Sequence, residues 1–147
     1  LFAAVKISYM VLPEEMARLF SSMAQDYSQT CSKLEQLTLA MFMESGHYQT
    51  HIKKLRKLYS QKLSAVTDTF AEEASDFVTV KNTSSGISVI LNVKSHKTTE
   101  ELKKDAEQLG IPAVPHPKEG LLALYYNQIP LVEIPRLFRI LIEKWRS

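Results

Sequence analysis

Two histidines spaced four residues apart are the first residues of this sequence whose positions suggest chemistry. His47 and His51 would lie on one face of a helix, at a spacing that is common for metal ligands. Glu44 lies close by, but no cysteine or carboxylate completes a ligand set in the sequence. Packing at the start of a helix, or a solvated helix face, accounts for such a pair more simply. The sequence therefore predicts no metal site.

A basic stretch follows these histidines, and it consists of Lys53, Lys54, Arg56, Lys57 and Lys62. Such residues can contact nucleic acid phosphates, or they can form a solvated face whose lysine stems cover apolar surface. The whole chain has 18 basic and 16 acidic residues, hence a formal net charge of +2. Because this charge is low, we expect a solvated face, and an independent nucleic-acid-binding module stays open as the alternative.

The remaining reactive side chains form no catalytic arrangement that spacing can support. Cys31 is the single cysteine, so the chain has no internal disulfide and no cysteine-rich metal site. His96 and His116 fall in predicted loops without a nucleophile beside them, and the four glycines form no phosphate-binding loop. The sequence therefore names no catalytic residue.

Length and composition are those of one ordinary globular domain. The chain has 147 residues, of which 45% are hydrophobic and 23% charged. No apolar run approaches the roughly 20 residues that a membrane helix needs, and no signal peptide is visible. We therefore expect a cytoplasmic protein without a membrane partner. The apolar start, Leu1 to Val5, leads us to expect a fragment of a longer protein.

The first half of the sequence predicts one strand and three helices. Residues 5–12 are rich in large apolar residues and stop at Pro13, which indicates a strand. Apolar residues at spacings of three and four predict helices over residues 14–26 and 31–44. The same spacing predicts a single helix over residues 47–73, roughly 40 Å long, which could bridge two structural layers. The strand has no obvious partner in this chain, so we expect its sheet to lie elsewhere.

The second half of the sequence changes to short strands alternating with helices. Strands are predicted over residues 77–81, 87–93, 111–114 and 121–126, and helices over 98–109 and from about 133 onward. Thr98 and Glu101 have the spacing of a capping box, and Pro135 is tolerable only in the first turn of the last helix. This order predicts an α+β fold in which helices pack against a small, mainly antiparallel sheet.

Three stretches of the sequence carry a family resemblance. Leu1–Pro13 resembles a segment that typically reads leucine-phenylalanine-proline-x-leucine-arginine-isoleucine-glycine-tyrosine-methionine-valine-x-proline. Leu34–Tyr59, with Gly46-His47-Tyr48 inside it, resembles a glutamine-x-x-leucine-alanine helix followed by the start of a long interdomain helix. Leu121–Trp145 is similar to the last strand and helix of the same proteins. These are the MocR/GabR-type members of the bacterial GntR family of transcriptional regulators.

The resemblance implies the C-terminal part of an aminotransferase-like domain of pyridoxal phosphate (PLP) fold type I. Residues 1–45 would be a C-terminal remnant of the large cofactor-binding domain, with a strand and two helices. Residues 46–147 would be the long interdomain helix and the small α+β domain, an antiparallel sheet with helices on one face. For the whole protein it implies a homodimer, a PLP-dependent sensor and an amino-acid-like effector. DNA would be bound only through an N-terminal winged helix-turn-helix outside this chain.

The resemblance also points to one cofactor residue. PLP needs a lysine amine for its Schiff base, and the family's lysine aligns just upstream of Leu1. We therefore expect this chain to carry no catalytic residue, to bind no PLP alone and not to be an enzyme. Lys6 stands where the family has an arginine that grips the cofactor phosphate, and it supplies charge without the bidentate fork. Lys6 is thus the candidate PLP-phosphate residue, or else a plain lysine at a strand end, and Ser8 beside it replaces a glycine.

The effector-binding positions implied by the resemblance are altered as well. The family holds the substrate carboxylate with an arginine before the last strand, whereas residues 111–121 contain none. Arg136 and Arg139 on the final helix are expected to face solvent, and Ser88 stands where the family often has a histidine. Because one fold serves regulators and enzymes, a C-terminal fragment of a genuine class I/II PLP-dependent aminotransferase remains the alternative.

Overall fold

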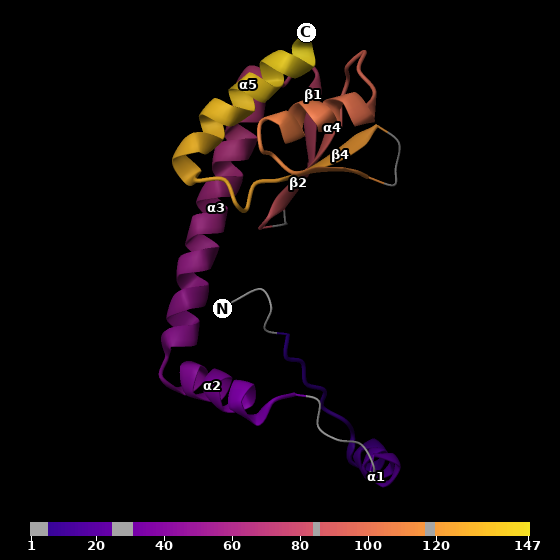
Figure 1. Ribbon diagram of the computed structural model, residues 1–147, viewed down its shortest axis with the longest axis vertical. Helices are drawn as coiled ribbons and strands as arrows, with labels where there is room; N and C mark the ends of the chain where they lie inside the picture. The colour runs from indigo at the N-terminus through magenta and orange to yellow at the C-terminus, as the bar shows by residue number, and fades with distance from the viewer. Residues whose placement is uncertain (1–5, 25–30, 84–85, 117–119) are drawn as a thin grey trace. The chain divides into compact units, whose positions relative to one another are not determined.

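The computed structural model describes residues 6–24, 31–83, 86–116 and 120–147. The chain splits into two compact units, Leu1–His51 and Ile52–Ser147. The helices and most of the strands are labelled in Figure 1. Among the described helices, none combines the length and the apolarity that crossing a membrane would require.

The described residues of the first unit include two short helices, α1 (Glu14–Met23) and α2 (Lys33–Glu44). Pro13 precedes α1, whose first turn carries two glutamates near the positive end of the helix. Neither helix has a buried residue. Both predicted helices are confirmed, although positions 25–30, including the predicted end of the first helix, lie outside the described residues.

The predicted strand over residues 5–12 is wrong for the part that the structure describes. Val5 lies outside the described residues, and residues 6–12 form neither helix nor strand. A strand needs a hydrogen-bonded neighbour, and no described segment pairs with this one. The side chains of Tyr9 and Val11 are accordingly 91% and 85% exposed. The apolar pattern shows that the segment suits a sheet, but a pattern cannot supply the neighbouring strand.

The long helix α3 spans His47–Glu73, which are the predicted bounds. It begins directly after Gly46, whose φ of 75° lies in the left-handed region that glycine adopts without steric cost. This residue lets α2 end at Glu44 and a new helix start three positions later. The boundary between the two units falls within α3, between His51 and Ile52.

The second unit is built on a four-stranded antiparallel sheet with the strand order β1-β2-β4-β3. The strands are β1 (Val78–Asn82), β2 (Ser88–Val93), β3 (Ala113–Pro115) and β4 (Leu121–Tyr125). In the central pair Val89 faces Leu124 and Leu91 faces Leu122. All four are buried, and because side chains alternate along a strand they share one face of the sheet. Positions 84–85 of the predicted turn and 117–119 of the predicted loop lie outside the described residues.

Helices α4 (Thr99–Gln108) and α5 (Ile134–Arg146) complete this unit, with a 3-10 turn at Leu131–Glu133 before α5. The capping box is present: Thr98 Oγ1 accepts from the Glu101 N–H at 3.3 Å, and the Glu101 carboxylate accepts from the Thr98 N–H at 2.7 Å. Pro135 lies in the first turn of α5, where its missing N–H costs nothing. Both predictions are confirmed.

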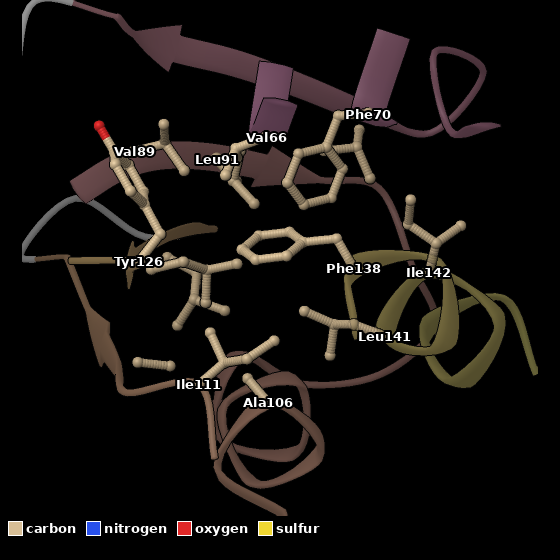
Figure 2. Close-up of a cluster of buried hydrophobic side chains, with 14 of the residues drawn as sticks. Val66, Phe70, Val89, Leu91, Ala106, Ile111, Tyr126, Phe138, Leu141 and Ile142 are labelled. Carbon is tan, nitrogen blue, oxygen red and sulfur yellow. The ribbon is translucent and has the colours of Figure 1, made fainter. Parts of the chain in front are cut away.

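The core of the second unit lies between one face of the sheet and three helices (Figure 2). Its ring contacts join α3 to α5: Phe70 meets Phe138 edge-on at 5.5 Å and stacks on Trp145 at 6.2 Å between centroids. The Trp145 indole N–H donates to the Leu102 carbonyl at 3.1 Å, so the last turn of α5 is also tied to α4. The predicted α+β fold, an antiparallel sheet with helices on one face, is confirmed.

Candidate functional site

Lys6, the candidate phosphate residue, lies in the first unit on the irregular segment before α1 and is exposed. A cofactor phosphate is usually held by several convergent donors, such as an arginine fork and backbone N–H groups at a helix N-terminus. Lys6 offers one point charge on a segment without regular structure. The described residues therefore do not fit PLP as a complete site, and the role of Lys6 in the whole protein stays a prediction.

The positions suggested for effector binding fall in the second unit. Arg136 and Arg139 are both exposed, as predicted. The Arg139 Nε lies 3.1 Å from a carboxylate oxygen of Glu73, so this charge is paired with the end of α3. Ser88 begins β2 and faces Tyr125 across the sheet. Neither arginine is thus positioned as a buried carboxylate clamp.

The two histidines of the sequence pattern pack around one aromatic ring at the corner between α2 and α3. The ring of Phe42 stacks on His47 at 6.4 Å and lies 6.3 Å from His51, between centroids. Tyr48 adds an edge-on contact at 6.1 Å. These contacts favour the interpretation as helix-start packing. Across the described parts of the chain, no group of three or more His, Cys, Asp or Glu residues is placed to hold a metal ion.

Lys62 is a buried cation that the sequence pattern had placed wrongly on a solvated face. Its relative exposure is 6%, and its ammonium donates to the main-chain carbonyl of Asn127 at 2.8 Å. The ammonium also lies 5.7 Å from the ring centroid of Tyr59. Burial lowers the pKa of this amine below its ordinary value of 10.5. Lys62 thus anchors α3 to the residues that follow β4.

Helical spacing could have identified Lys62, because it lies four residues before Val66 and eight before Phe70, which are both core residues. Close to it in the fold, Tyr126 is fully buried, and burial followed by the nearby Tyr59 raises the pKa of its phenol. Burial thus lowers the pKa of the Lys62 amine and raises the pKa of the Tyr126 phenol. The amine of Lys62 is held by a main-chain carbonyl, which makes its role structural.

A second charged cluster links the end of α5 to the end of α3 and to the connection between α3 and β1. Arg146 donates to both carboxylate oxygens of Asp76, at 2.7 and 3.0 Å, and to the Glu73 carbonyl at 2.8 Å. Its guanidinium lies 4.7 Å from the ring centroid of Phe77. The hydrogen bond from Arg146 is the main reason that the pKa of Asp76 lies below its usual range. With its donors engaged in this way, Arg146 is a clamp rather than a ligand site.

The chain resembles transcriptional regulators in sequence and aminotransferases in structure. No family model matches the chain. The uncharacterized HTH-type transcriptional regulator YdeL of Bacillus subtilis is 29% identical over 153 residues, which covers 99% of this chain and 33% of that protein. The regulator YhdI of the same organism is 29% identical over 134 residues, covering 91% of this chain and 28% of that protein. The probable rhizopine catabolism regulatory protein MocR of Rhizobium meliloti is 24% identical over 111 residues, covering 76% and 22%.

The resemblance to MocR-type regulators is confirmed. This chain spans about a third of the length of the first of these curated relatives.

Three solved structures that resemble this chain are aminotransferases. The α-aminoadipate aminotransferase LysN of Thermus thermophilus matches with a TM-score of 0.64 at 19% identity, covering 90% of this chain and 35% of that one. The kynurenine aminotransferase of Pyrococcus horikoshii matches with a TM-score of 0.67 at 16% identity, covering 88% of this chain and 34% of that one. The multiple substrate aminotransferase of Thermococcus profundus matches with a TM-score of 0.69 at 19% identity, covering 90% of this chain and 34% of that one. The fold is that of the small C-terminal domain of a PLP-dependent aminotransferase.

Proposed function

We propose that this chain is part of the effector-sensing, aminotransferase-like domain of a bacterial MocR-type transcriptional regulator, and that it has neither a DNA-binding domain nor a PLP lysine of its own. One observation carries the proposal. Nearly the same residues align in sequence with HTH-type regulators and in structure with aminotransferases. A regulator that uses an aminotransferase-like sensor accounts for both likenesses together.

The first 45 residues would belong to the large domain of that sensor, and residues 46–147 would be the long interdomain helix and the small domain. The apolar stripe of α1 supports this division. Met16, Leu19 and Phe20 are 56%, 59% and 50% exposed, although an amphipathic helix normally buries its apolar stripe. Helix α2 likewise exposes Leu34 at 74%. Such faces suit packing against further residues of a large domain.

In the whole protein we propose a cytoplasmic homodimer that binds PLP through a lysine outside this chain, with Lys6 near the cofactor phosphate. An amino-acid-like effector would react at that site. DNA would be bound by an N-terminal winged helix-turn-helix. The part of the protein in hand would contribute the mobile small domain, with α3 as the connection between domains.

Reaction with PLP tests the proposal directly. The chain is mixed with PLP, reduced with borohydride and mapped by peptide mass spectrometry. We expect no stoichiometric adduct at any one lysine, because no described lysine lies in a complete PLP site. The whole protein serves as the positive control, with one lysine labelled outside these residues. A stoichiometric adduct at a single lysine of this chain would contradict the proposal.

The alternative is part of a genuine aminotransferase, which the three structural neighbours favour by fold alone. The gene region upstream of the codon for Leu1 distinguishes the two. A winged helix-turn-helix encoded there supports the regulator, and its absence would defeat the regulator proposal. A transamination assay of the whole protein with amino acid donors then tests the enzyme directly.

A further inference from the structure

The charges of this chain are strongly segregated along the sequence. From Ser45 to Thr67 there is no Asp or Glu, yet this segment contains five of the 18 basic residues. The remainder of the chain therefore holds 13 basic and all 16 acidic residues. A near-neutral total thus conceals a cationic segment inside an acidic protein. Such a segment attracts polyanions more strongly than the net charge of +2 indicates.

The structure separates the members of this segment by exposure. Lys53, Lys54, Arg56 and Lys57 are all exposed on neighbouring turns of α3, and we name them the α3 basic turn. The ion pairs formed by the described residues use other cations, including Arg139 and the clamp at Arg146. Exposed Ser60 and Gln61 continue the same helix with further hydrogen-bonding groups.

We propose that the α3 basic turn contacts the phosphate backbone of duplex DNA, so that this chain adds its own share to DNA binding. The inference goes beyond the proposed function, in which only a separate N-terminal domain touches DNA. Residues 53–57 cover about 6 Å of helix axis at 1.5 Å per residue. Duplex DNA carries one negative charge per about 1.7 Å, hence three to four charges over the same length.

The chemistry of the surface also favours DNA. Lysine and arginine donors are the usual partners of phosphate oxygens, and serine and glutamine side chains often accompany them. The sequence relatives of the chain are HTH-type regulators, a class whose name denotes a DNA-binding motif. Phosphate contacts carry no base information, so we expect binding that is independent of DNA sequence and strongly dependent on salt.

Fluorescence anisotropy of the purified chain with a labelled random-sequence duplex tests this at about 25 to 200 mM NaCl. Four phosphate contacts predict a slope of about −3.6 for the logarithm of the binding constant against that of the salt concentration. This corresponds to a loss of affinity of roughly 150-fold between about 50 and 200 mM salt. No PLP and no helix-turn-helix takes part, so the result is independent of the proposed function.

Two variants with the same change in net charge make the test specific. Lys53→Gln combined with Lys57→Gln should reduce the slope to about −1.8, since two phosphate contacts are lost. Lys81→Gln combined with Lys94→Gln removes two exposed lysines, one in β1 and one just after β2, and should leave the slope near −3.6. All four side chains are exposed, and unchanged fluorescence of the buried Trp145 verifies the fold of each variant.

Three results would overturn the proposal. One is no binding at the lowest salt concentration. Another is an equal loss for both double variants, which would indicate a general effect of charge. The third is displacement of DNA by polyglutamate at equal charge concentration, which would show that the α3 basic turn recognises an acidic polypeptide.

Discussion

Replacing Lys62 with methionine should remove a pH dependence from the stability of the second unit. Burial lowers the pKa of Lys62 in the folded chain below the value of 10.5 that it regains on unfolding. The unfolded state therefore binds this proton more tightly than the folded state. Between the lowered pKa and 10.5, the free energy of unfolding of the wild-type chain rises as the pH rises. The Lys62→Met variant has no such proton, so its curve should lack this rise.

The size of the effect follows from one proton. A single group changes the free energy of unfolding by at most about 1.4 kcal/mol per pH unit within its window. At pH 7 two terms oppose each other. The variant loses the 2.8 Å hydrogen bond to the Asn127 carbonyl, worth about 1.5–3 kcal/mol for a charged donor, and it gains by removing a buried charge. We expect a net loss at pH 7 smaller than the hydrogen bond alone, and a growing difference from wild type as the pH rises.

Urea unfolding followed by tryptophan fluorescence measures this, because Trp145 is the single tryptophan and is buried in the core of the second unit. The raised pKa of Tyr126 makes the folded chain lose stability only above the ordinary phenol pKa of 10.0. Measurements from about pH 7 to 9.5 therefore stay below the titration of Tyr126. Lys54→Met, at an exposed position of the same helix, should follow the wild-type curve. Parallel curves for wild type and Lys62→Met would refute the reasoning.

Three further substitutions probe the second unit with the same readout. Arg146→Gln removes the hydrogen bonds that lower the pKa of Asp76. The stability that they give is present above the ordinary pKa of 3.8 and is lost as the pH falls through the lowered pKa, so the free energy of unfolding of the variant should fall less steeply with acid than that of the wild type. An unchanged acid dependence would count against the clamp. Thr98→Ala should lower the free energy of unfolding by about 1 kcal/mol through loss of the N-cap, and no loss would mean that the capping box contributes nothing. Phe138→Ala should lower the free energy of unfolding by about 3–5 kcal/mol, because the side chain is fully buried. Val132→Ala, at a side chain that is 86% exposed, should change it by less than about 0.5 kcal/mol. Similar losses for both variants would contradict the assigned core.

Elements with local signals were predictable from the sequence. The bounds of α3 follow from a sustained three-and-four spacing of apolar residues. The start of α4 follows from Thr98 and Glu101, whose reciprocal hydrogen bonds need only a few consecutive residues. Pro135 marks the first turn of α5 because no later turn tolerates it. For α4 and α5 the deciding interaction lies within one turn of helix, so it depends little on distant residues.

The predicted strand over residues 5–12 failed for the opposite reason. Its residues have the β-branched and apolar composition of a strand, but a strand exists only when another segment pairs with it. That information is non-local, and no described residue of this chain provides the partner. The candidate site has the same limitation. A phosphate site depends on donors from several segments, so no local pattern identifies Lys6 as part of one. Its suggested role comes only from the family resemblance.

The basic stretch shows how helical phase decides what a charge does. Lys53 and Lys62 are nine residues apart, which at about 100° per residue places them on opposite sides of α3. The first is exposed and the second is 6% exposed, although the sequence presents them as one run. Their perturbations should therefore separate cleanly. Lys62→Met should change the pH dependence of stability and leave the salt dependence of DNA binding intact, while Lys53→Gln with Lys57→Gln should do the reverse. If either variant altered both quantities, the two sides of the helix would not act independently.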